Sequence, residues 1–89
     1  MPRPSGQAAG GATLEEAWHV LCESVRDCAE GYAATDPSNA YLYRRDAEWF
    51  CDKDAPRNDE ELLDRHAQAA GLRESWGALF VTNLRRRAR

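Results

Sequence analysis

Five side chains in this 89-residue sequence are of the types that ligate zinc, namely His19, Cys22, Cys28, Cys51 and His66. Thiolates and imidazoles are the usual zinc ligands, but a site needs a spacing that brings them together. His19 and Cys22 share one face of a helix, whereas Cys28 lies six positions beyond Cys22 and points elsewhere. No Cys-x-x-Cys pair is present. We therefore interpret the cysteines as small core residues and expect neither a metal nor a cofactor.

Motifs of nucleophilic catalysis and phosphate binding are missing as well. The sequence contains no Gly-x-Ser-x-Gly, no Gly-rich phosphate loop and no His-Glu-x-x-His. Asp52, Asp54 and Asn58 resemble a calcium loop, but the central Gly is absent and Leu63 stands where the bidentate Glu should be. A helical domain of this size also has little room for a substrate pocket. We therefore expect no enzyme and no small-molecule substrate.

Charge is divided unevenly along the chain. Residues 1–64 carry a net charge of −8, and residues 65–89 carry +5. Either pole can steer a partner of opposite sign. The sequence therefore favours two kinds of partner, DNA or a host protein complex, and we rank them near parity.

The DNA-binding hypothesis places a helix-turn-helix in the C-terminal half. Ala67 allows two helices to approach, Gly71 makes the turn, and Leu72 re-enters the core. Gly77 departs from this pattern, because a branched residue is usual there. The basic side chains that would contact DNA, mostly at phosphates, are Arg73, Arg85, Arg86, Arg87 and Arg89.

The protein-binding hypothesis uses acidic side chains on two expected helices. Glu23 and Asp27 lie on the first helix, and Asp59 and Glu60 on the third. Such surfaces dock onto basic protein patches, including patches that otherwise hold nucleic acid. A protein-directed inhibitor would act in this way.

Helix caps and breakers predict an all-α domain of about four helices over residues 13–89, orthogonal or bundle-like. Residues 1–12 are small and rich in breakers, which predicts a flexible tail. Thr13 and Glu16 form a capping box for a helix over residues 14–31, ended by Gly31. Asp36 is then expected to cap a second helix that begins at Pro37 and ends before the polar loop 52–57.

The last two helices are separated by Gly71 in this prediction. Asn58 caps the third helix, with Glu61 as a capping-box partner. The fourth helix runs from about residue 73 to residue 87 and carries arginines in its last turn. Side chains expected to face the core are Leu14, Trp18, Leu21, Val25, Cys28, Tyr32, Tyr43, Ala47, Phe50, Leu62, Leu63, His66, Ala67, Ala69, Ala70, Leu72, Trp76, Leu79, Phe80 and Leu84. The pattern leaves open whether Tyr41 and Trp49 lie in the core or at an interface.

Composition predicts a soluble globular chain, with 43% hydrophobic and 30% charged residues. Its longest uncharged apolar run is far shorter than the ~20 residues that span a bilayer. No apolar region of a secretory signal follows Arg3, and the cysteine count is odd. We therefore expect a cytoplasmic protein with reduced thiols and no membrane partner.

Residues 44–50, Arg-Arg-Asp-Ala-Glu-Trp-Phe, are followed by Ala-Ala-Gly-Leu at 69–72 and by an arginine-bearing last helix. This arrangement resembles short helical proteins encoded in phages and prophages. The likeness covers roughly residues 39–87. His66 and Ala67 stand where that group often has a Cys, and Arg73-Glu74 replaces its usual Asp-Pro. The resemblance implies a mobile-element accessory protein that binds DNA as a regulator or host defence machinery, for example a CRISPR effector, as an inhibitor.

Overall fold

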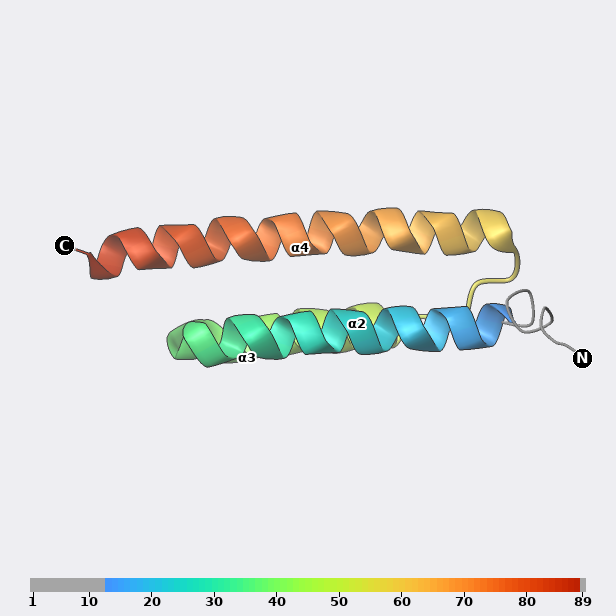
Figure 1. Cartoon of the computed structure of the whole chain (residues 1–89), viewed down its shortest axis with the longest axis horizontal. Helices are drawn as coiled ribbons and strands as arrows, with labels where there is room; N and C mark the ends of the chain where they lie inside the picture. The colour runs from blue at the N-terminus through green and yellow to red at the C-terminus, as the bar shows by residue number, and fades with distance from the viewer. Residues whose placement is uncertain (1–12, 89) are drawn as a thin grey trace, which may run out of the picture.

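The computed structural model describes residues 13–88, and within this range it contains helices but no strand. The elements are α2 (Leu14–Thr35), the 3₁₀ helix η1 (Pro37–Asn39), α3 (Ala40–Cys51) and α4 (Asp59–Arg87). In Figure 1, α2 and α4 run in the same direction, and α3, which joins them along the chain, runs in the opposite direction. The three helices lie side by side. The all-α prediction is confirmed. The expected tail lies outside the described residues.

The first helix begins where the sequence predicts. The Thr13 hydroxyl accepts a hydrogen bond from the backbone N–H of Glu16 at 3.0 Å, and the Glu16 carboxylate accepts one from the backbone N–H of Thr13 at 2.9 Å. This reciprocal pair satisfies two amides that the helix leaves unbonded. The capping box is therefore confirmed.

The helix α2 is longer than predicted, because Gly31 lies within it. Its last turn places Tyr32 against the core and buries Ala33, and this burial outweighs the weak helix preference of Gly31. The helix ends only at Thr35. Asp36 then leaves the helical conformation, as expected for a residue that precedes a proline.

Asp36 does not cap the second helix, contrary to the prediction. Its side chain makes no capping hydrogen bond to η1 or α3. The chain first makes the 3₁₀ turn at Pro37–Asn39, and α3 begins at Ala40. The Asp36 side chain is fully buried, and its carboxylate instead accepts hydrogen bonds from other side chains, including Tyr43 and Arg87.

The predicted third and fourth helices form one continuous helix, α4, so the prediction of four helices is wrong. Gly71 has a helical backbone, and a Cβ atom at this position would meet open space. A mid-helix glycine costs only about 1 kcal/mol relative to Ala. The inward-facing series Ala69, Leu72 and Trp76 continues across Gly71, and its burial holds the helix together.

Asn58 caps α4 as predicted, with its side-chain oxygen accepting from the backbone N–H of Glu61 at 2.9 Å. The Glu61 carboxylate accepts from the backbone N–H of Arg57 instead of Asn58. The capping-box partner is therefore displaced by one residue.

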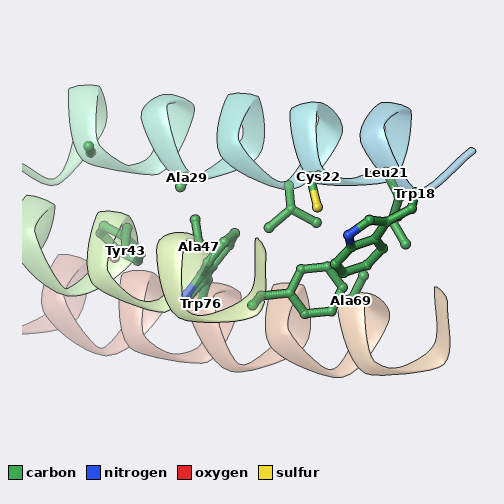
Figure 2. Packing of buried hydrophobic residues seen from close by; sticks show 11 residues of the cluster. Trp18, Leu21, Cys22, Ala29, Tyr43, Ala47, Ala69 and Trp76 are labelled. Atoms are coloured by element: carbon green, nitrogen blue, oxygen red, sulfur yellow. The ribbon is translucent and has the colours of Figure 1, made fainter. Parts of the chain in front are cut away.

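The core lies along the seam where the three helices meet (Figure 2). Trp18 packs on Phe50 with ring centroids 5.3 Å apart, and Tyr32 stacks on Tyr43 at 5.2 Å. Trp76 of α4 meets the edge of Tyr43 at 6.2 Å. The remaining buried apolar side chains are Leu21, Cys22, Val25, Ala29, Ala33, Ala47 and Ala69.

Only two side chains of α4, Ala69 and Trp76, are buried hydrophobic residues. Leu63 is 69% exposed and Leu84 is 45% exposed, so both differ from the predicted core. His66, Ala67 and Ala70 are exposed as well. The predicted apolar face of this helix was too wide, because α4 contacts α2 and α3 through only a narrow part of its circumference.

We expect Trp76→Ala to lower the free energy of unfolding by about 3–5 kcal/mol, because it removes the largest fully buried side chain and leaves a cavity in the core. Trp49→Ala is the matched control, since Trp49 is 66% exposed, and it should cost less than about 1 kcal/mol. Urea unfolding followed by circular dichroism measures both. Equal losses would show that Trp76 has no special place in the core.

Candidate functional site

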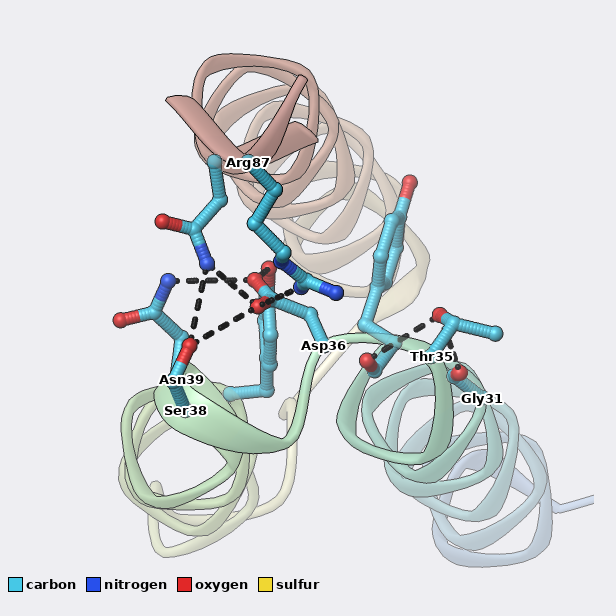
Figure 3. A network of polar contacts seen from close by, with 9 residues as sticks. Gly31, Thr35, Asp36, Ser38, Asn39 and Arg87 are labelled. Carbon is cyan, nitrogen blue, oxygen red and sulfur yellow. Dashed lines mark hydrogen bonds and ion pairs between the residues drawn. The ribbon is translucent and has the colours of Figure 1, made fainter. Parts of the chain in front are cut away.

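A polar cluster surrounds the buried carboxylate of Asp36, where the end of α2 meets the end of α4 (Figure 3). Arg87 donates to it from α4 at 2.8 Å, and Tyr43 donates from α3 at 2.6 Å. Its other donors are Ser38, Asn39 and Asn83. Because these residues come from η1, α3 and α4, the carboxylate joins the ends of all the helices.

Burial alone would raise the pKa of Asp36, but the hydrogen bonds from Tyr43, Asn39, Asn83 and Ser38 outweigh it and lower the pKa to about 2. Burial and the neighbouring carboxylate raise the pKa of the Tyr43 hydroxyl. Asp36 is therefore an anion with its donors in place, as expected of a structural site. Sequence reasoning missed this role, because an Asp before a Pro is more often a helix cap.

The predicted DNA-binding arginines have different surroundings. Arg73 donates to the Ser24 hydroxyl at 2.9 Å, and Arg87 pairs with Asp36. Both help to hold α4 against the rest of the chain. Arg85 and Arg86 are exposed, and Arg89 lies outside the described residues. The helix-turn-helix prediction is wrong, because no turn interrupts α4.

The predicted acidic residues are exposed but form two pairs. Glu23 and Asp27 are one turn apart in the middle of α2, and His19 lies 3.6 Å from Glu23. Asp59 and Glu60 lie in the first turn of α4, where negative charge stabilises the helix dipole. The two pairs therefore lie on two different helices, α2 and α4.

The three cysteines are free thiols in this structure. Cys22 is buried in the core. The Cys51 thiol donates to the backbone carbonyl of Cys22 at 3.6 Å. Burial, followed by the hydrogen bond with Cys51, raises the pKa of Cys22 to about 12. Within residues 13–88, no group of three or more His, Cys, Asp or Glu side chains is arranged to hold a metal ion.

The outer face of α3 carries a surface that the sequence left undecided. Tyr41 and Trp49 are 67% and 66% exposed, and Arg45 lies between them at helical spacing. The Lys53 ammonium lies 4.1 Å from the centroid of the Trp49 ring. We call these four residues the α3 face. The spacing of four residues was a usable signal, because Tyr43, Ala47 and Phe50 occupy the opposite side of the helix.

Ion pairs fix α3 against α2 beside this face. Arg44 donates to both carboxylate oxygens of Glu30, at 2.8 and 2.9 Å, and Arg26 donates to Glu48 at 3.0 Å. Both pairs are exposed, so each contributes little stability. Their two-point geometry nevertheless orients α3 and the side chains that it presents.

Comparison with protein-family models, curated proteins and solved structures finds no match to this chain. Its function is therefore inferred from its own side chains. Among the described helices, none combines the length and the apolar character that crossing a membrane requires.

We expect Asp36→Asn to lower the Tm by at least about 5 °C near neutral pH, because it removes a hydrogen-bonded buried charge. The pKa of Asp36 in the folded protein, about 2, lies below its ordinary value of 3.8. The ionised carboxylate therefore contributes its full stabilisation at a pH above 3.8. That contribution is lost as the pH falls through about 2. The Tm difference from the wild type should therefore shrink below about pH 4. Asp27→Asn, at an exposed position, is the control, and a difference independent of pH would contradict the prediction.

The raised pKa of Cys22 makes its thiol a poor nucleophile in the folded protein, because the thiolate is the reactive form. We expect a short iodoacetamide pulse near neutral pH to alkylate the half-buried Cys28 well before Cys22, as measured by peptide mass spectrometry. In urea the two cysteines should react alike. Equal rates in the folded protein would contradict the burial of Cys22.

Proposed function

We propose that this chain is a small non-enzymatic binding module that docks to a protein partner through the α3 face. The observation that carries the proposal is the exposure of two large aromatic side chains, Tyr41 and Trp49, on one side of a short helix. Tyr, Trp and Arg are the residue types that most often dominate the binding energy of protein interfaces. The α3 face presents all three over slightly more than two turns of helix.

The α3 face is preorganised for binding. Its residues lie on or just beyond a regular helix, and the buried side chains Tyr43, Ala47 and Phe50 on the opposite side hold that helix in place. Lys53 stacks on Trp49, which restricts the indole. A rigid surface loses less entropy when it binds. Lys53 adds positive charge, and so does Arg45, whose side chain stays 67% exposed although it pairs with Asp46 at 3.1 Å. The fitting partner therefore offers an apolar pocket edged by carboxylates.

The resemblance to phage-encoded proteins supports a more specific form of this proposal, in which the partner belongs to host defence machinery such as a CRISPR effector. Here Glu23 and Asp27 on α2, together with Asp59 and Glu60 on α4, meet basic patches of the target. Their exposure supports this role. The α3 face then supplies the apolar anchor, and the acidic pairs steer the approach.

DNA contact is the second candidate, favoured by the exposure of Arg85 and Arg86 in the last turn of α4. Its support is weaker, because Arg73 and Arg87 are engaged within the chain. Contact of this kind would be made with phosphates and would weaken steeply with salt.

Photo-crosslinking tests the docking surface. We expect p-benzoyl-phenylalanine at position 41 or 49 to crosslink one discrete protein in the native host, with the yield falling about tenfold when Arg45→Glu is added. Position 20 is the matched control, because Val20 is a 62% exposed apolar residue on α2. Equal crosslinking from position 20, or no crosslink from α3, would contradict the proposal.

A mobility-shift assay separates the second candidate. A shift at low salt that Arg85→Ala and Arg86→Ala abolish, without any protein crosslink from α3, would replace protein docking by DNA contact.

A further inference from the structure

The helix α4 carries a second apolar stripe that the described part of the chain leaves mostly uncovered; of its members only Gly77, beside the Tyr32 hydroxyl, is half-buried. Leu63 is 69% exposed, Leu84 is 45% exposed and Val81 is 43% exposed. Ala67 and Ala70 are exposed as well, and Gly77 is half-buried. We call these residues the α4 stripe: Leu63, Ala67, Ala70, Gly77, Val81 and Leu84.

The α4 stripe has the spacing of a helix-packing seam. Its members recur at intervals of four, three, seven, four and three residues, which keeps them on one side of a helix. At 3.6 residues per turn, the middle of the stripe lies about a third of a turn around α4 from the buried side chains Ala69 and Trp76, and Gly77 and Leu84 lie nearer to them. One apolar side of α4 therefore faces the core, and a second one faces solvent.

The charges of α4 show what kind of helix fits this stripe. Its first six residues include four acidic side chains, Asp59, Glu60, Glu61 and Asp64, whereas its last three residues are all arginine. A second α4 lying antiparallel brings each acidic end against a basic end. The helix dipoles also oppose one another favourably in this orientation. A parallel arrangement would bring like charges together.

The stripe is also complementary to itself in one antiparallel register. With Leu63 opposite the partner's Leu84, Ala70 falls opposite the partner's Gly77. Small residues near the centre allow the two helices to approach closely. Glu60 and Arg85 border the stripe on the same side, which sets them against each other across the pair.

We propose that two copies of this chain associate through antiparallel packing of their α4 stripes. Residues 63–84 span about 32 Å of helix, which makes the contact a small interface. The dimer is accordingly weak, with a dissociation constant of about 10–100 μM. This surface is separate from the α3 face, so the dimer leaves that face free.

Sedimentation velocity of the full chain from about 1 to 500 μM measures this association. We expect the monomer to convert to a dimer over this range, and Val81→Glu to weaken the dimer by at least about thirtyfold. The control is Val20→Glu, which puts the same charge at an exposed valine of α2 and should leave the constant unchanged. A chain that stays monomeric to about 500 μM, or a dimer that survives Val81→Glu, would overturn the proposal.

A charge swap tests the antiparallel orientation. Glu60→Arg and Arg85→Glu should each weaken the dimer about fivefold to tenfold, because each places like charges across the pair twice. The double variant, with both changes in one chain, should restore the wild-type constant. Both residues are exposed, and circular dichroism checks that the helices remain intact. Failure of the double variant to restore the dimer would overturn the antiparallel arrangement.

Discussion

The packing of the Trp76 indole against the aromatic side chains of α2 and α3 holds α4 to the rest of the structure. The ring meets the edges of Tyr32 and Tyr43, and its N–H donates to the Asp46 carboxylate at 3.2 Å. Two polar contacts lie on either side of Trp76 along α4. Arg65 donates to the backbone carbonyl of Asp54 near the start of α4, and Arg87 reaches Asp36 at its end. A 29-residue helix is thus fixed at its middle and near both ends, which leaves most of its circumference free.

How far the sequence predicts the fold depends on whether a signal is local. The caps Thr13 and Asn58 act through hydrogen bonds that reach only three residues, so their side chains and spacing suffice to locate the helix starts. Gly31 and Gly71 were expected to end helices, because an isolated glycine is a common stop signal. Whether it stops a helix depends on the burial of the residues beyond it, here Tyr32 and Leu72. That burial is tertiary information.

The candidate site shows the same division. Tyr41 and Trp49 lie on a helix whose buried side is apparent from Tyr43, Ala47 and Phe50, so their spacing was available in the sequence. Their exposure depends on where α4 packs. The ion pair of Arg87 with Asp36 spans 51 residues. No local pattern could assign that arginine to a structural role, and a basic tail is the natural reading of its neighbours.

The distance along the chain between the contacts of Asp36 bears on the order in which the structure assembles. The helices α2 and α3 are joined by a short 3₁₀ turn, so closing that pair costs little loop entropy. The contacts of Asn83 and Arg87 with Asp36 require a loop of about fifty residues to close. We therefore expect the hairpin of α2 and α3 to form early, with the carboxylate accepting its last two donors only when the third helix docks. The segment that docks last is also the one that carries the unpartnered stripe, so newly made chains would meet one another through it.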